Sequence, residues 1–283
     1  MWPFSSAPKI PVLRLTGPIG MAAPLRPSLS LASAAGAIER TFTYSKLPAV
    51  AIVVNSPGGS PVQSNLIFNR IRQLSEEKKK KVYVFCEDVA ASGGYFLAVA
   101  GDEIYADPSS IVGSIGVIAA SFGFVEALNK LGIERRVYTA GENKSILDPF
   151  KPAREEDIAR LKAIQLDIHE VFKDVVRSRR GDKLKADDAE LFSGAFWVAG
   201  KAQELGLIDG VADVRTRMRE EFGDKVVLHN IKLQTGGLLA RLRRSTFLPP
   251  VLDHEGLSGL RLEFAEDLVS TAEKRMLWQR YGL

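Results

Sequence analysis

The sequence predicts an α/β fold with parallel strands, and three observations support this prediction. Apolar runs of strand length recur along the first half of the chain, as expected for strands that a sheet buries on both faces. Glycine-rich turns follow three of these runs, and apolar residues at helical spacing follow most of the turns. The repeated order of strand, turn and helix is typical of parallel α/β units. With 283 residues, 46% of them apolar, the chain can bury a substantial core.

The N-terminal part is expected to hold two strands and two helices. Residues 10–15 alternate between apolar and polar types, which predicts an edge strand, and residues 29–44 have helical apolar spacing. Residues 50–54 form a continuous apolar run that predicts a strand buried on both faces, followed by a helix over residues 62–76. We expect residues 1–46 to form an N-terminal strand and helix ahead of the main domain.

The middle of the chain continues the alternation of strands and turns. The strands that we expect here cover residues 81–85, 103–106, 117–120 and 133–139. A short helix should follow Ser92, and a second one should cover residues 124–131 and end at Gly132, because glycine is the usual residue after a helix C-terminus.

After Pro152 the pattern becomes helical. Apolar residues recur every three or four positions over residues 158–180, which predicts a long amphipathic helix, and residues 197–205 predict another. Residues 260–281 again have an amphipathic pattern. We therefore expect a core domain over residues 47–222 and a C-terminal extension over residues 223–283, to which the sequence assigns no role.

Composition and charge exclude several classes of function. Cys86 is the sole cysteine, so an intrachain disulfide is impossible. The net charge of +4 comes largely from the clusters at residues 78–81 and 241–244 rather than from one extended basic face, and we expect no nucleic-acid partner. Neither a P-loop nor a dinucleotide fingerprint is present, so we expect no nucleotide cofactor.

The sequence contains no pattern that predicts insertion into a membrane. No run of 18 apolar residues occurs, and the first residues lack the basic and apolar regions of a signal peptide. We therefore expect a cytoplasmic protein. Residues 238–248 interleave leucine and phenylalanine with arginine, so peripheral contact with the inner membrane stays open beside the plainer alternative of a surface loop.

The strongest candidate for chemistry is Ser92, which lies where the strand over residues 81–85 gives way to a helix. Gly93 and Gly94 follow it, and glycine lets the backbone approach a bound carbonyl while a helix N-terminus offers free N–H groups. These features fit a nucleophile turn, although the spacing is not G-x-S-x-G. A helix N-cap followed by a tight turn explains the same residues equally well.

A nucleophilic serine needs a base. The three histidines are His169, His229 and His254. None follows a core strand, and a Ser-His-Asp triad is disfavoured but not excluded. Lys144 directly follows the strand expected over residues 133–139. An ordinary lysine has a pKa of about 10.4, so a basic lysine must be desolvated, and Ser114 offers a hydroxyl to orient it. A solvated loop lysine is the plain alternative.

Four short segments in order carry a resemblance to a known family: residues 55–60, 90–95, 113–117 and 141–144. Together they closely resemble the signal peptide peptidase A family, including its SohB-type members. The resemblance covers roughly residues 47–215 and implies a serine peptidase with a Ser-Lys dyad on a ClpP/crotonase-like fold of repeated β-β-α units. It implies no metal and no cofactor.

The resemblance also assigns roles to residues of this chain. It makes Ser92 the nucleophile, Lys144 the general base and Ser114 the hydroxyl that orients the lysine. It further implies an oxyanion hole built from backbone N–H groups, those of Gly58 or Gly59 and of Gly93. We expect the substrate pocket to be apolar, with walls from Tyr95, Ile111, Val112 and Ile118.

The expected activity is endoproteolysis of peptides, either signal-peptide remnants or small unfolded segments. In short members of the family neighbouring subunits complete the dyad, so the resemblance implies a homo-oligomer in which one chain supplies Ser92 and another supplies Lys144. Two alternatives stay open. An acyl-CoA enzyme of the crotonase type shares the fold, and a non-catalytic oligomeric scaffold needs no dyad.

Overall fold

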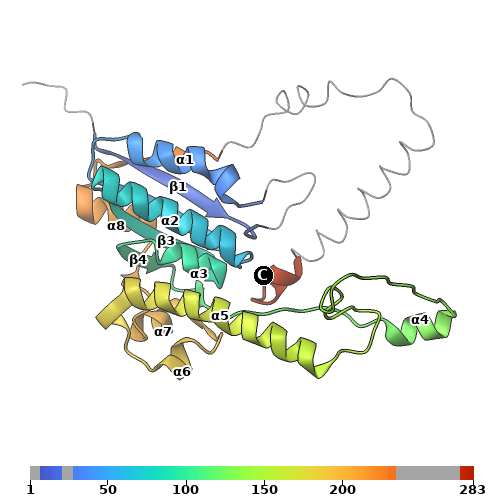
Figure 1. Cartoon of the computed structure of the whole chain (residues 1–283). Helices are drawn as coiled ribbons and strands as arrows, with labels where there is room; N and C mark the ends of the chain where they lie inside the picture. Colours follow the sequence, from blue (N-terminus) through green and yellow to red (C-terminus); the bar gives the residue numbers. More distant parts are fainter. Residues whose placement is uncertain (1–6, 21–27, 234–274) are drawn as a thin grey trace, which may run out of the picture.

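The computed structural model describes residues 7–20, 28–233 and 275–283, which form a central eight-stranded sheet with helices packed against it (Figure 1). The strands run β6-β5-β3-β2-β1-β8 across the sheet, while β4 pairs with β3 and with β7. Every pair is parallel except β5 with β6. The predicted α/β class is therefore confirmed.

The strands of the sheet are β1 (Lys9–Thr16), β2 (Ala49–Ser56), β3 (Lys81–Ala91), β4 (Glu103–Ala106), β5 (Ile111–Gly113), β6 (Phe196–Val198), β7 (Gly210–Val211) and β8 (Val227–Ile231). The helices are α1 (Leu31–Thr43), α2 (Pro61–Lys78), α3 (Gly93–Ala98), α4 (Val125–Leu131), α5 (Glu155–Arg180), α6 (Asp188–Leu191), α7 (Ala199–Glu204) and α8 (Val214–Phe222). A short 3₁₀ turn, Gly181–Lys183, follows α5.

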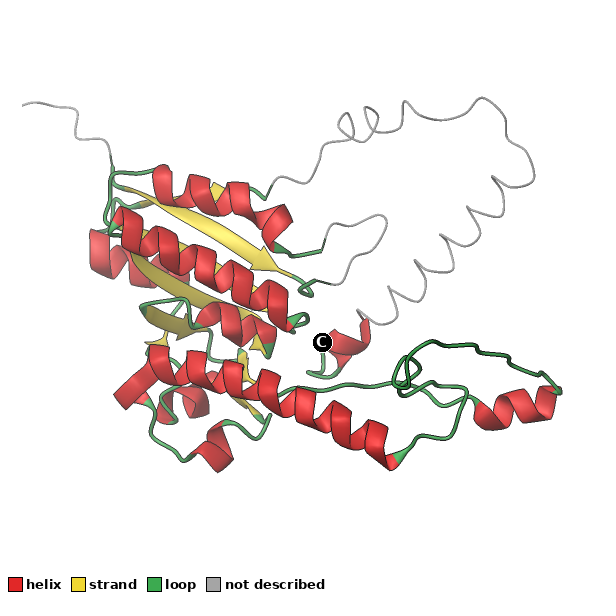
Figure 2. Ribbon diagram, viewed as in Figure 1, coloured by secondary structure: helices red, strands yellow, loops and turns green. Residues whose placement is uncertain are grey.

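The central strands are buried on both faces, as their continuous apolar runs predict. Side chains alternate between faces along β2. Val50, Ile52 and Val54 join the large core beneath α1, α2 and α3, while Ala51 and Val53 join a second cluster that contains Met218 of α8. The ribbon in Figure 2 shows helices covering both sides of these strands. These two cores hold the sheet in place from both faces. The candidate site lies at the carboxyl ends of its strands.

Four secondary-structure predictions are wrong in whole or in part. Residues 10–15 are not an edge strand, because β1 lies between β2 and β8 and its partner β8 comes from far along the chain. Residues 117–120 and 133–139 form no strand, since no strand of the described chain lies beside them to pair with. Residues 196–198, at the start of the helix expected over 197–205, form β6 and pair with β5.

Residues 118–153, called the arm here, project from the body of the molecule (Figure 1). The arm contains α4, which ends at Gly132 in the left-handed conformation as expected (φ 64°). None of its residues is buried. The chain then returns toward the sheet through α5.

The described helices include none that is both long and apolar enough to cross a membrane. Most of the helix predicted over residues 260–281 lies outside the described residues, as do the basic cluster at 241–244 and the segment at 238–248. Residues 275–279, within the predicted range, are helical.

Candidate active site

Ser92 occupies the corner between β3 and α3 with a backbone conformation that serine rarely adopts. Its φ is 52° and its ψ is −123°. Such a conformation costs on the order of 1–3 kcal/mol and persists only where the surrounding packing enforces it. Although Ser92 precedes the helix, its side chain makes no capping hydrogen bond. The structure therefore does not support the N-cap interpretation of Ser92. No capping hydrogen bond occupies its hydroxyl, which can react with a bound ligand.

Close packing on both sides holds this corner in place. The Ser92 N–H donates to the carbonyl of Gly113 at 2.8 Å, which ties the corner to the end of β5. A methyl group on Gly94 would lie 2.3 Å from the Ser56 carbonyl oxygen, and one on Gly93 would lie 2.5 Å from Ser64 Oγ. Glycine is required at Gly94 because the atom in the way belongs to the backbone of β2, whereas at Gly93 it is a side-chain hydroxyl of α2.

The Gly58–Gly59 turn lies against Ser92 and Gly93. A methyl group on Gly58 would lie 2.8 Å from Ser92 Cβ and 2.9 Å from Gly93 N, and one on Gly93 would lie 3.3 Å from Gly59 N. Ile19 holds the turn, because its N–H donates to the Gly58 carbonyl and its carbonyl accepts from the Ser60 N–H, each at 2.8 Å. The backbone N–H groups of both turns thus converge beside the serine.

The N–H groups in this cluster differ in availability. The Gly58 N–H donates to Ser56 Oγ at 3.2 Å. Within the described parts of the chain, no oxygen accepts the N–H of Gly59 or of Gly93. Two free N–H groups next to a serine hydroxyl are the arrangement that stabilises an oxyanion.

Ser114 lies one residue beyond the carbonyl that holds Ser92. Its φ is 53° and only 3% of its surface is exposed. Its N–H donates to the Ala195 carbonyl at 2.6 Å, which anchors it to the start of β6. The hydroxyl of Tyr281 lies 3.3 Å from its Oγ. The structure therefore gathers Ser92, Ser114 and the glycines Gly58, Gly59 and Gly93 at one end of the sheet.

Lys144 is not part of this cluster. It lies in the arm, exposed, with its backbone N–H donating to the Gly141 carbonyl at 3.2 Å. It is absent from the residues that line the pocket beside Ser92. A single chain therefore presents the serine and the lysine in separate regions.

Neither histidine of the described chain forms a hydrogen bond with Ser92. The Nε2 atom of His169 lies 3.1 Å from the carbonyl oxygen of Ile115. His229 stacks on Tyr44, with ring centroids 4.1 Å apart. His254 lies outside the described residues. The described residues also contain no group of three or more side chains suited to holding a metal ion.

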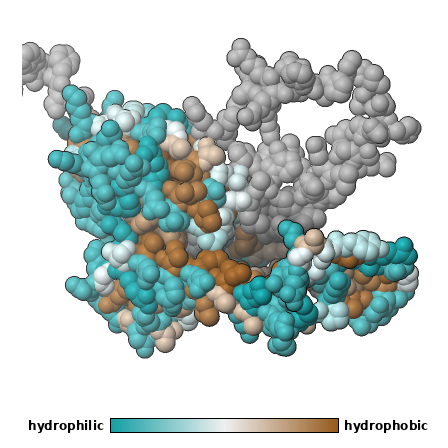
Figure 3. Space-filling model, in the orientation of Figure 1, coloured by the Kyte–Doolittle hydropathy of each residue, from teal (hydrophilic) through white to brown (hydrophobic). Residues whose placement is uncertain are grey.

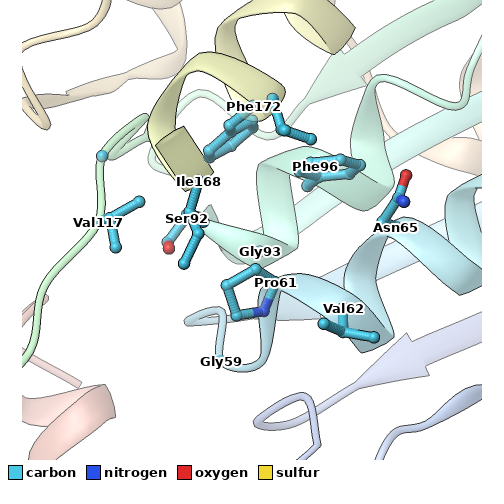
Figure 4. Close-up of a pocket in the computed structure, with 12 residues that line it drawn as sticks. Gly59, Pro61, Val62, Asn65, Ser92, Gly93, Phe96, Val117, Ile168 and Phe172 are labelled. Atoms are coloured by element: carbon cyan, nitrogen blue, oxygen red, sulfur yellow. The ribbon is translucent and has the colours of Figure 1, made fainter. Parts of the chain in front are cut away.

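A cavity of about 210 Å³ opens beside Ser92 (Figure 4). Most of its side-chain walls are apolar, and the lining residues are Gly59, Pro61, Val62, Asn65, Ser92, Gly93, Phe96, Gly116, Val117, Ile168, Val171 and Phe172. Figure 3 shows hydrophobic surface where the α2 and α5 layers face each other. The pocket thus combines a polar corner with apolar walls from three helices.

The apolar character of the pocket was expected, but the expected wall residues are wrong. Tyr95 is fully buried, and its hydroxyl donates to the Leu207 carbonyl at 2.7 Å. Burial raises the pKa of Tyr95 above its ordinary value, so the phenol stays neutral and serves the packing of α3. Phe96, on the next position of α3, and Phe172 of α5 form walls instead, with their rings 4.9 Å apart.

Comparison with known proteins gives one family. The model of peptidase family S49 matches residues 75–224. The chain is 55% identical over 279 residues to a Na⁺/H⁺ antiporter NhaA of Brucella abortus, a match that covers 97% of this chain and 37% of the Brucella protein. That name describes the whole Brucella protein, of which this chain matches about a third.

Two further relatives carry protease names. The chain is 32% identical over 218 residues to the chloroplastic serine protease SPPA of Arabidopsis thaliana, covering 75% of this chain and 31% of that protein. It is 31% identical over 185 residues to the Haemophilus influenzae protein named "Probable protease SohB", covering 65% of this chain and 50% of that protein. The chain thus spans from a third to half of the length of these relatives.

Proposed function

Since the chain belongs to peptidase family S49, we propose that it is a serine endopeptidase in which Ser92 forms the acyl-enzyme. The observation that carries this proposal is the strained, uncapped Ser92 beside the free N–H groups of Gly59 and Gly93. A nucleophile needs an exposed hydroxyl, and its transition state needs donors aimed at the developing oxyanion. Ser92 is half-buried but lines the open cavity, and the free N–H groups of Gly59 and Gly93 lie beside it.

The proposed reaction proceeds by acyl transfer. A base removes the Ser92 proton as Oγ attacks the scissile carbonyl carbon, and the carbonyl oxygen becomes an oxyanion between the Gly59 and Gly93 N–H groups. The base then gives the proton to the departing amine, and water hydrolyses the ester by the same route. Each oxyanion donor contributes roughly 3–4 kcal/mol to the transition state. We assign Gly59 rather than Gly58 because Ser56 Oγ already accepts the Gly58 N–H.

We propose that Lys144 of a second copy of the chain is the base, with Ser114 orienting it. The arm that carries Lys144 buries none of its residues, yet it exposes large apolar side chains: Ile118, Phe122, Leu131 and Tyr138 are 68%, 73%, 71% and 90% exposed. Covering such surface contributes about 25 cal/mol per Å². A homo-oligomer in which each arm packs on a neighbour would cover it and carry Lys144 to that neighbour's Ser92.

The proposed substrates are peptides, either signal-peptide remnants or small unfolded segments, with an apolar side chain beside the cleaved bond. The apolar walls around Phe96 and Phe172 support this choice because they would bury such a side chain. We propose the cytoplasm as its location, with peripheral contact at the inner membrane as the alternative, and cell fractionation distinguishes the two.

Labelling with a fluorophosphonate tests the proposed function directly. The probe should modify the native protein at Ser92, found by mass analysis of the labelled peptide, and modification should vanish in Ser92→Ala. Ser178→Ala removes a hydroxyl near the C-terminal end of α5, and this variant should be labelled as the wild type is. Absence of labelling together with turnover of a CoA thioester would indicate the acyl-CoA alternative, and absence of both would indicate a scaffold.

A further inference from the structure

The last residues of the chain pack beside the candidate site, although they lie far from Ser92 in the sequence (Figure 1). Tyr281 is 7% exposed and forms a small apolar cluster with Val89 and Ala91 of β3. Its ring also meets that of Phe196 in β6, edge to face, with centroids 5.1 Å apart. The C-terminal segment is thus seated on the strands that end at Ser92 and Ser114.

The hydroxyl of Tyr281 reaches Ser114, the side chain to which the lysine-orienting role is assigned. It donates to Ser114 Oγ at 3.3 Å, in a buried contact. A buried phenol strongly favours having a hydrogen-bond partner, because a buried hydroxyl without one has lost its hydrogen bonds to water and gained none in return. The contact therefore gives the Tyr281 hydroxyl a partner in Ser114.

We propose that Tyr281 is a positioning residue that orients the Ser114 hydroxyl toward the lysine base. This inference rests on the proposed function, because it gives Ser114 and the lysine the roles stated there. The role is Tyr281's own: it belongs to the C-terminal extension, to which neither the motifs nor the match over residues 75–224 assigns any part in the site.

The physical reason lies in the donor and acceptor capacity of a hydroxyl. Ser114 has one proton and two lone pairs. When Tyr281 donates to Oγ, the Ser114 proton is free to point at the lysine nitrogen, and donation to that nitrogen favours the neutral amine that accepts the Ser92 proton. Without the phenol, Oγ is freer to accept from the lysine ammonium, which favours the charged and inactive form. Tyr281 itself gives up no proton in the reaction.

Tyr281→Phe isolates this role because it keeps the ring packing on Val89, Ala91 and Phe196 and removes only the hydroxyl. We expect kcat/KM for a peptide to fall about threefold to tenfold, the effect of one lost hydrogen bond. The acidic limb of the pH–rate profile should move to higher pH, because less of the lysine is neutral at a given pH. Tyr44→Phe, which removes a hydroxyl from the ring stacked on His229, should leave both unchanged.

A double-mutant comparison shows whether the effect passes through Ser114. In a Ser114→Ala background, Tyr281→Phe should cause no further loss, since the group that it orients is gone. An additional loss of the same size, an unshifted pH profile in Tyr281→Phe alone, or a rise in activity would each overturn the proposal. A rise would mean that the C-terminal segment covers the site rather than supporting it.

Failure of this inference and failure of the proposed function give different results. A wild-type protein that neither labels at Ser92 nor cleaves peptide contradicts the proposed function, and with it the role of Tyr281. A wild-type protein that labels and cleaves, with Tyr281→Phe indistinguishable from it, contradicts the positioning role alone.

Discussion

The corner around Ser92 and the arm that carries Lys144 differ in what holds them in place. The corner is enclosed by β2, α2 and β5, so tightly that Gly94 has no room for a methyl group. The arm has no buried residue and is held by contacts within itself, such as the stacking of Phe124 on Phe150 and the ion pair of Arg135 with Asp148. Of the proposed dyad, Ser92 is preorganised by the chain's own core. Lys144 has no enclosing surface among the described residues of the same chain.

The largest expected effect lies at Ser92. Ser92→Gly should lower peptide cleavage by about 10⁴-fold or more, because the acyl-enzyme cannot form. The same change should raise the free energy of unfolding by about 1 kcal/mol, since glycine adopts a φ of 52° without strain. Denaturant unfolding measures the second effect.

Ser178→Gly is the matched control, because Ser178 lies in the regular helix α5. Glycine inside a helix should lower the stability by about 0.5–1 kcal/mol, so the two serine-to-glycine changes are expected to have opposite signs. Equal destabilisation by both would show that the Ser92 backbone holds no strain.

A glycine pair compares the packing of the two regions. Gly94→Ala places a methyl group 2.3 Å from the Ser56 carbonyl oxygen and should cost about 2–4 kcal/mol of stability. Gly123→Ala in the arm meets no atom within 4 Å and should change stability by less than about 0.5 kcal/mol. Thermal unfolding of the two variants checks this, and comparable losses would contradict the contrast between corner and arm.

Two carboxylates, Asp209 in the body of the molecule and Glu134 in the arm, extend the comparison to the pH dependence of stability. Burial tends to raise the pKa of Asp209, but hydrogen bonds from Arg180 and Lys183 outweigh it and hold the pKa below its ordinary value. The carboxylate therefore stabilises the fold above the unfolded-state pKa of about 4, and this contribution is lost as the pH falls through the lower folded-state pKa.

Asp209→Asn should lower the free energy of unfolding by about 2–3 kcal/mol at pH 7, because it leaves the buried Arg180 without its counter-charge. The loss should shrink in acid, as the pH falls through the lowered folded-state pKa of the wild-type carboxyl. Glu134→Gln breaks an exposed pair with Arg136 on the arm and should have no measurable effect at either pH. A pH-independent loss in Asp209→Asn would contradict the electrostatic explanation.

The parts of the fold that the sequence predicted are those with a strong local signal. The continuous apolar run of β2 and the regular spacing along α5 depend on nearby residues alone. The interior place of β1 could not be predicted, because it depends on pairing with β8 more than 200 residues later. A strand was expected over residues 133–139, but a strand also needs a partner, and the described chain supplies none.

The same distinction applies to the site. The glycine-rich motifs predicted the corner at Ser92 because a tight turn is encoded where it occurs. Phe172 and Tyr281 were missed as neighbours of the site because they lie about 80 and 190 residues from Ser92 and reach it through tertiary packing. The helical spacing around Phe172 indicated a buried face, but nothing in it indicated which surface that face would meet.

The central claim, that two chains complete one site, is tested most directly by mixing two inactive variants. Ser92→Ala keeps the lysine and Lys144→Ala keeps the serine, so each alone should be inactive while native mass shows an intact oligomer. Co-assembled in equal amounts, one site in about four should combine an intact serine with a neighbour's lysine, restoring about one quarter of the wild-type activity. An inactive mixture with demonstrated co-assembly, or Lys144→Ala active on its own, would contradict the claim.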